Sequence, residues 1–221
     1  MTAGARFVEV DVQITLDQVP VLFHDRNLRR LCGVCGKIHE RRFEELETLR
    51  VADPERFGER FKETRITRLD ELGHFLTQHP DVTAFIELKR SSLEHFGIET
   101  MLHLVRHALK PVLKQCVLIS YALDALLVAR QNGWPRIGVV VDHWRERQQE
   151  IIAAIQPQFL FCDVNGLPPK GELRLPGVQL VIFEVADPLV ALMLAARGVD
   201  FIETYAVGEM LRALASSADA G

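Results

Sequence analysis

The stretch that most constrains this chain is Phe7–Gln13, where three valines alternate with the other residues. This alternation predicts a β-strand, since β-branched residues favour strands and the period is two. Side chains of a strand alternate between its faces, so Glu9 and Asp11 point the same way, one pleat apart. Two neighbouring carboxylates repel and cost free energy unless a positive group lies between them. An edge strand with a solvated acidic face would also account for this pair.

Two further segments add charged groups to strand ends. The apolar stretch Val19–Phe23 runs into His24 and Asp25, and the apolar stretch Ala84–Lys89 carries Glu87 one pleat before its last residue. Strand ends that carry polar residues are typical of sites on parallel sheets. The sequence therefore predicts a site built from two or three neighbouring strands.

The residue types indicate which chemistry such a site would suit. Glu9, Asp11 and Glu87 offer only carboxylate oxygens, which are ligands for a hard cation such as Mg²⁺ or Ca²⁺. His24 and Lys89 add a proton-transfer group and a cation that suit a phosphate ester. A phosphoryl-transfer centre is therefore favoured over a chance grouping of acids.

The composition excludes several classes of protein. The chain has 221 residues, 48% of them apolar, and a net charge of −4 with acids and bases interspersed. We therefore expect one domain with a sizeable core and no nucleic-acid partner. No apolar run reaches the ~18–20 residues that a transmembrane helix needs, and the start shows no signal peptide. The expected location is cytoplasmic, unless a leader lies upstream of Met1.

The middle and end of the chain alternate between short apolar strands and helical stretches. The expected strands after Phe7–Gln13 are Ala84–Lys89, Cys116–Ser120, Ile137–Val141, Phe159–Asp163, Gln179–Val185 and Val199–Thr204. The expected helices are Phe43–Leu49, Thr67–Gln78 with Thr67 as its cap, Glu94–Leu109, Leu123–Asn132, Arg145–Ile155, Pro188–Arg197 and Val207–Ala215. This rhythm predicts parallel β/α units, and it supplies seven strands where a closed barrel has eight.

Three segments together resemble the glycerophosphodiester phosphodiesterase family. They are the Glu-x-Asp strand Phe7–Gln13, the His24-Asp25 pair after Val21–Phe23, and Phe85–Lys89 with its Glu-Leu-Lys end. The resemblance extends over nearly the whole chain. It implies an α/β fold, a TIM barrel of the phospholipase C-like phosphodiesterase type. The family's small insertion after the His-Asp strand would cover about residues 26–66, within a single domain spanning residues 1–221.

The resemblance also implies roles for the site residues. Glu9, Asp11 and Glu87 would hold one Mg²⁺ or Ca²⁺, and His24 would be one of two acid/base histidines. Lys89 would help to hold the substrate phosphate or the carboxylates of the metal ligands. In the family's scheme the glycerol hydroxyl attacks phosphorus and water then opens the cyclic phosphate. The implied activity is metal-dependent hydrolysis of glycerophosphodiesters to glycerol 3-phosphate and an alcohol such as choline, which belongs to lipid and glycerol metabolism.

One departure from the family pattern leads to an alternative. The family's first strand ends in His-Arg-Gly, which supplies the other catalytic histidine, and nothing before Gly4 matches it. We therefore expect the first strand and helix of the barrel to be missing. The alternative function is a catalytically impaired barrel that binds a divalent cation and phosphate esters. A barrel lacking one strand has two unpaired edges, so marginal stability or a homodimer is a further expectation.

Overall fold

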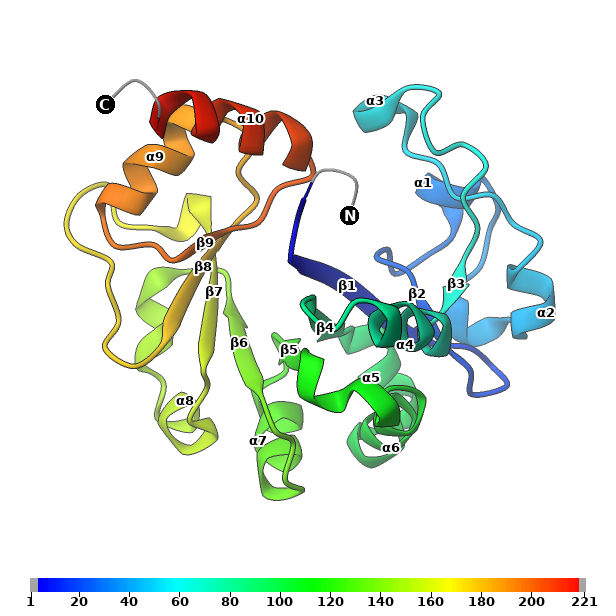
Figure 1. The fold of residues 1–221 in the computed structure, drawn as a ribbon. Helices are drawn as coiled ribbons and strands as arrows, with labels where there is room; N and C mark the ends of the chain where they lie inside the picture. The colour runs from blue at the N-terminus through cyan, green and yellow to red at the C-terminus, as the bar shows by residue number, and fades with distance from the viewer. Residues whose placement is uncertain (1–3, 219–221) are drawn as a thin grey trace. The chain divides into compact units, whose positions relative to one another are not determined.

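The computed structural model describes residues 4–218 (Figure 1). Its backbone contacts divide the described residues into two compact units, residues 7–118 and residues 119–218, the latter joined by residues 4–6. Below they are called the amino-terminal and carboxy-terminal units, and each is described by itself. The expected single domain, with an insertion over about residues 26–66, stays a prediction.

The amino-terminal unit is organised around β1 (Phe7–Ile14). Strand β4 (Thr83–Leu88) pairs with β1 in parallel, and β2 (Pro20–Leu22) pairs with β1 in antiparallel fashion. Strand β3 (Thr67–Arg68) extends this side as the antiparallel partner of β2, and β5 (Cys116–Ser120) begins beyond β4. The predicted turn between the first two strands therefore closes a hairpin that carries His24 to the edge of β1.

Helices occur in all three stretches of this unit where helical spacing was predicted, and short helices that were not predicted occur as well. They are α1 (Arg29–Cys32), α2 (Phe43–Leu46), α3 (Pro54–Phe57), α4 (Leu69–Gln78), α5 (Arg90–Phe96) and α6 (Ile98–Ala108), with 3₁₀ turns η1 (Ile38–Glu40) and η2 (Lys110–Gln115). The prediction of one continuous helix over Glu94–Leu109 is wrong. Gly97 has φ +80°, outside the helical region, so it ends α5 and α6 begins after it.

The start of α4 also differs from the prediction. Thr67 belongs to β3, and the residue before the helix is Arg68, whose backbone N–H donates to Glu71 Oε1 at 3.1 Å. Asp70 accepts two bonds from the Arg68 guanidinium. The helix cap therefore lies one residue later than predicted, because pairing with β2 holds Thr67 extended.

The predicted insertion packs on β2 with a small core of its own. Its buried apolar side chains come from β2, from the residue after it and from widely spaced positions of the insertion: Val21, Phe23, Leu28, Ile38, Leu46 and Ile66. Burial of this size contributes several kcal/mol, since one fully buried aliphatic side chain contributes ~1.5–3 kcal/mol. The insertion is therefore a packed element that fixes the end of β2.

The carboxy-terminal unit contains four parallel strands in sequence order. They are β6 (Ile137–Val141), β7 (Phe159–Asp163), β8 (Gln179–Phe183) and β9 (Phe201–Ile202). Its helices are α7 (Leu123–Gln131), α8 (Glu150–Ile155), α9 (Pro188–Ala196) and α10 (Val207–Ala218), with 3₁₀ turns η3 (Trp144–Gln148) and η4 (Val164–Gly166). The strand-helix alternation matches the prediction, although the expected helix Arg145–Ile155 is divided into η3 and α8.

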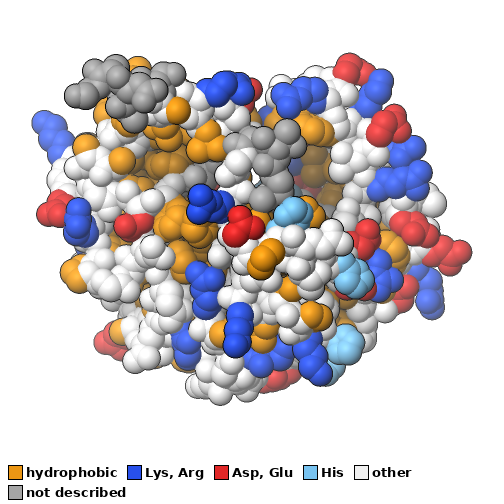
Figure 2. Space-filling model, viewed as in Figure 1, with side chains coloured by type: hydrophobic (Ala, Val, Ile, Leu, Met, Phe, Trp, Pro, Cys, Tyr) orange, Lys and Arg blue, Asp and Glu red, His pale blue; other side chains and the backbone are white. Residues whose placement is uncertain are grey.

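Charged side chains of both signs are scattered over the face of the protein shown in Figure 2. This agrees with the interspersed charges of the sequence. Over residues 4–218, none of the helices combines the length and the apolar character that crossing a bilayer requires.

Close packing in the carboxy-terminal unit predicts a sensitive glycine. A Cβ added at Gly138 in β6 would lie 2.9 Å from Ile119 Cγ2 and 3.0 Å from Phe159 Cβ. Both neighbours are buried, so the strands would have to separate. We expect Gly138→Ala to lower the free energy of unfolding by ~1–3 kcal/mol, measured by urea titration. An unchanged unfolding midpoint would contradict this account of the packing.

Candidate active site

Three carboxylates meet on neighbouring strands of the amino-terminal unit. Glu9 and Asp11 share one face of β1, and the parallel register places Asp11 opposite Glu87 of β4. Each of the three offers one oxygen, and these oxygens lie within 4.8 Å of one another. All three residues are half-buried, and Glu9 Oε1 is fully buried. The structure thus brings together the acids that the sequence singled out.

Lys89 lies between two of these acids. Its Nζ is 2.9 Å from Asp11 Oδ1 and 3.0 Å from Glu87 Oε1, and only 19% of its side chain is exposed. Burial acts to lower the pKa of Lys89, but Glu87 and Asp11 together outweigh it, so the pKa is raised. The ammonium therefore stays charged over the physiological pH range.

The pKa of Glu87 is raised, mainly because the residue is buried. Burial raises the pKa of Glu87, Lys89 opposes the shift, and the nearby Asp11 carboxylate adds to it, so the net direction is upward. His24 acts on the pKa of Glu87 in the lowering direction. The three acids offer only oxygen atoms, and an all-oxygen donor set of this kind suits a hard divalent cation.

His24 follows β2 and lies beside the acid next to it in sequence. Its Nδ1 is 2.8 Å from Asp25 Oδ1, and 63% of its side chain is exposed. Arg30 of α1 donates from Nε to Asp25 Oδ2 at 2.7 Å and from Nη2 to Oδ1 at 2.6 Å. Burial acts to raise the pKa of Asp25, but the hydrogen bonds from Arg30 and His24 outweigh it and lower it. Asp25 is therefore a carboxylate at neutral pH.

A buried glutamine fixes the backbone around this pair. Gln13 Nε2 donates to the carbonyl oxygens of Phe23 at 2.9 Å and Asp25 at 2.7 Å. Its Oε1 accepts from Ser91 Oγ at 3.1 Å. Sequence reasoning missed this role, although Gln13 continues the period-two series of Glu9 and Asp11. A polar residue on that face of a strand was the available signal.

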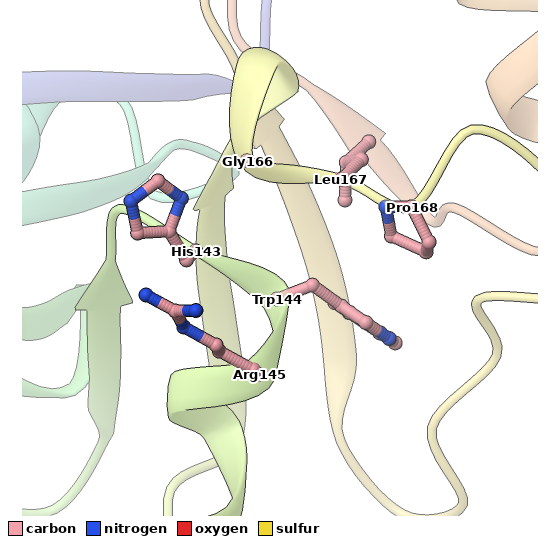
Figure 3. Close-up of a pocket in the computed structure, with 6 residues that line it drawn as sticks. All are labelled: His143, Trp144, Arg145, Gly166, Leu167 and Pro168. Atoms are coloured by element: carbon pink, nitrogen blue, oxygen red, sulfur yellow. The ribbon is translucent and has the colours of Figure 1, made fainter.

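The carboxy-terminal unit holds a cavity of about 310 Å³ at the ends of β6 and β7. It is lined by His143, Trp144, Arg145, Gly166, Leu167 and Pro168. In Figure 3 the His143 ring and the Arg145 side chain lie on one side, while Trp144 extends to the other, toward Leu167 and Pro168. A Cβ on Gly166 would overlap the carbonyl oxygen of Asp142, so glycine allows this close approach. The cavity contains none of the predicted site residues.

Comparison with known sequences agrees with the family resemblance noted in the sequence. The model of the glycerophosphoryl diester phosphodiesterase family matches residues 1–149. Glycerophosphodiester phosphodiesterase 1 of Rattus norvegicus is 33% identical over 101 residues, which are 43% of this chain and 30% of the rat protein. The Bacillus altitudinis glycerophosphodiester phosphodiesterase is 33% identical over 97 residues, or 44% of this chain and 39% of that protein. The matches thus span only 30% and 39% of the lengths of these two relatives.

Solved structures extend the likeness over almost the whole chain. An Oleispira antarctica phosphodiesterase, solved with the product sn-glycerol-3-phosphate, has a TM-score of 0.81 at 22% identity, covering 96% of this chain and 86% of that one. A Parabacteroides distasonis glycerophosphodiester phosphodiesterase has a TM-score of 0.73 at 20% identity, covering 98% and 87%. At such identities the likeness shows the fold alone. The predicted α/β fold of the TIM-barrel phosphodiesterase type is confirmed.

Removing the ammonium from the acidic site should destabilise the fold. Lys89→Met leaves Asp11 and Glu87 without their shared partner, and we expect the free energy of unfolding to fall by about 2 kcal/mol in EDTA, since breaking a fully buried pair costs ~3–5 kcal/mol. Lys62→Met is the matched control, because Lys62 pairs with Glu59 on the surface. Equal urea midpoints for the two variants would contradict the bridging role.

Asp25 should contribute to the pH dependence of stability. Its folded pKa lies below the ordinary value, so the stabilisation is complete above ~pH 4, near the unfolded pKa, and is lost as pH falls through the folded pKa. We expect wild type to exceed Asp25→Asn in unfolding free energy at pH 7, and the difference to shrink below ~pH 4. Urea titrations at several pH values measure it, and a constant difference would refute this linkage.

Proposed function

The chain belongs to the glycerophosphoryl diester phosphodiesterase family, and we propose on that basis that it hydrolyses glycerophosphodiesters to an alcohol and glycerol 3-phosphate. The observation that carries the proposal is the convergence of Glu9, Asp11 and Glu87 beside Lys89. The product found with the Oleispira antarctica protein supports the substrate class. The proposed substrate is a small molecule with a glycerophosphate group.

The three carboxylates are the proposed ligands of one divalent cation, Mg²⁺ or Ca²⁺. Their oxygens lie within 4.8 Å of one another, which a single ion can span, and no sulfur or nitrogen ligand belongs to the set. When bound, the cation would draw charge from a non-bridging phosphate oxygen and make phosphorus a better electrophile. Burial and then the Asp11 carboxylate raise the pKa of Glu87, and a bound cation would favour its ionised form.

Lys89 is the proposed phosphate-binding residue. Its ammonium is already held by Asp11 and Glu87, so binding a phosphate requires little further ordering of the side chain. Its raised pKa keeps it charged throughout the reaction. The ammonium can therefore hold a phosphate oxygen at the acidic cluster and offset the added negative charge.

His24 is the proposed proton-transfer residue. Its ring is well exposed, so a substrate can reach it, while Nδ1 is occupied by the Asp25 carboxylate. When Nδ1 carries the proton that Asp25 accepts, Nε2 is the atom left to exchange a proton with the substrate. Nε2 would first accept the proton of the attacking hydroxyl, and the resulting imidazolium would donate that proton from Nε2 to the oxygen of the departing alcohol, which leaves poorly as an alkoxide.

The activity and its metal requirement can be tested together. We expect release of glycerol 3-phosphate from glycerophosphocholine to need added Mg²⁺ or Ca²⁺ and to stop in EDTA. Glu87→Gln and Glu9→Ala should abolish the metal-dependent rate, and His24→Ala should lower kcat by ~10²–10⁴-fold. Glu59→Gln is the matched control on the surface, where 86% of the side chain is exposed.

Metal binding measured by calorimetry separates the outcomes. Full turnover by His24→Ala would refute its proton-transfer role, and turnover in EDTA would refute the metal requirement. Cation binding that is lost in Glu87→Gln, without turnover of any diester by wild type, would support the alternative of a binding protein for phosphate esters.

A further inference from the structure

A chain of ion pairs links His24 to the packed insertion. Asp25 Oδ1 faces both His24 Nδ1 and Arg30 Nη2, and the second oxygen of Asp25 accepts from Arg30 Nε. The third guanidinium nitrogen, Nη1, donates to Asp53 Oδ2 at 2.8 Å. Arg30 therefore uses one planar fork to hold two carboxylates, one from each side.

Asp53 is itself fixed by the local fold of the insertion. Its Oδ1 accepts from the backbone N–H of Arg56 at 3.3 Å and so caps α3. The neighbouring Ala52 N–H donates to the carbonyl oxygen of Leu31 at 2.9 Å, which ties this segment to α1. The side chains of Asp25 and Asp53 are only 15% and 19% exposed. The two carboxylates are therefore rigid anchors for the guanidinium.

The exposure of Arg30 indicates what these ion pairs can do. Arg30 is 52% exposed, and ion pairs with such exposure contribute little to stability. A bidentate pair nevertheless imposes a fixed geometry on the carboxylate that it holds. With both oxygens of Asp25 engaged by Arg30, Oδ1 is presented to His24 in one orientation. The ion pairs of Arg30 therefore affect the orientation of the Asp25 carboxylate more than they affect the stability of the fold.

We propose that Arg30, anchored by Asp53, is a positioning residue that acts through Asp25 to fix the orientation and tautomer of the His24 ring. The fixed carboxylate selects the ring form with its proton on Nδ1, and this leaves Nε2 to exchange protons with the substrate. The catalytic meaning of this inference rests on the proposed function. The tautomer itself is a property of the chain and can be observed without substrate.

The test compares four variants with wild type. Arg30→Met removes the fork, Arg30→Lys keeps the charge without the parallel hydrogen bonds, and Asp53→Asn weakens the anchor while retaining Oδ1 as the cap of α3. Arg50→Met is the matched control, because Arg50 pairs with Glu63 in the same insertion and is 48% exposed. Long-range ¹H–¹⁵N spectra of labelled protein at pH 8 report the tautomer of His24, and glycerophosphocholine hydrolysis gives kcat and KM.

We expect wild type and Arg50→Met to show the Nδ1–H tautomer, and Arg30→Met and Arg30→Lys to show a mixture. In the same two variants kcat should fall ~10–100-fold, as for other residues that orient a functional histidine, with KM changing less than ~3-fold. Asp53→Asn should show a smaller effect of the same kind. Because Arg30→Lys keeps the positive charge, its effect reports the loss of the parallel hydrogen bonds and not the loss of a charge.

The outcomes separate this inference from the proposed function. A single unchanged tautomer and unchanged kcat in Arg30→Met would overturn the positioning role even if wild type is an active phosphodiesterase. If wild type hydrolyses no diester, the proposed function fails, and the tautomer spectra alone decide whether Arg30 positions the ring. Should Arg30→Met not fold, Arg30→Lys and Asp53→Asn supply the same comparison.

Discussion

The structure of the candidate site depends on the repulsion among three carboxylates that two adjacent strands force together. The parallel register places Asp11 beside Glu87, and period-two geometry places Glu9 on the same face. Lys89 supplies one positive charge from the residue that follows β4. Glu9 adds a third carboxylate, and one oxygen from each of the three acids lies within 4.8 Å of the others. A divalent cation bound there would reduce the repulsion among them.

The insertion gives the second half of the site its order. Its small core packs on Val21 and Phe23, so the backbone that leads to His24 is held from one side. Gln13 holds the same backbone from the other side through the carbonyl oxygens of Phe23 and Asp25. The His-Asp pair is thus supported by buried groups although the His24 ring itself is exposed. A rigid support beneath an exposed ring is what a proton-transfer role requires.

Position in the sheet agrees with the general behaviour of parallel α/β folds. Glu87 lies near the carboxyl end of β4, Lys89 follows that end, and Asp11 is in register with Glu87. In barrels of parallel strands the carboxyl ends carry the functional residues, because the loops that follow them converge on one face. The insertion follows β2 and contributes Arg30 and Asp53 to the surroundings of His24. Both the metal-ligand candidates and the proton-transfer candidate therefore come from a short part of the fold.

The sequence by itself determined the strands Cys116–Ser120, Ile137–Val141 and Phe159–Asp163 to the residue, because apolar β-branched runs bounded by turn residues leave little choice. It also determined which acids share a face, since alternation is a property of any strand. Only the tertiary structure decided which groups surround the His-Asp pair. Arg30 and Asp53 lie 23 positions apart in the sequence, and no local pattern relates them. Their meeting depends on how the insertion packs, and packing is a property of the whole fold.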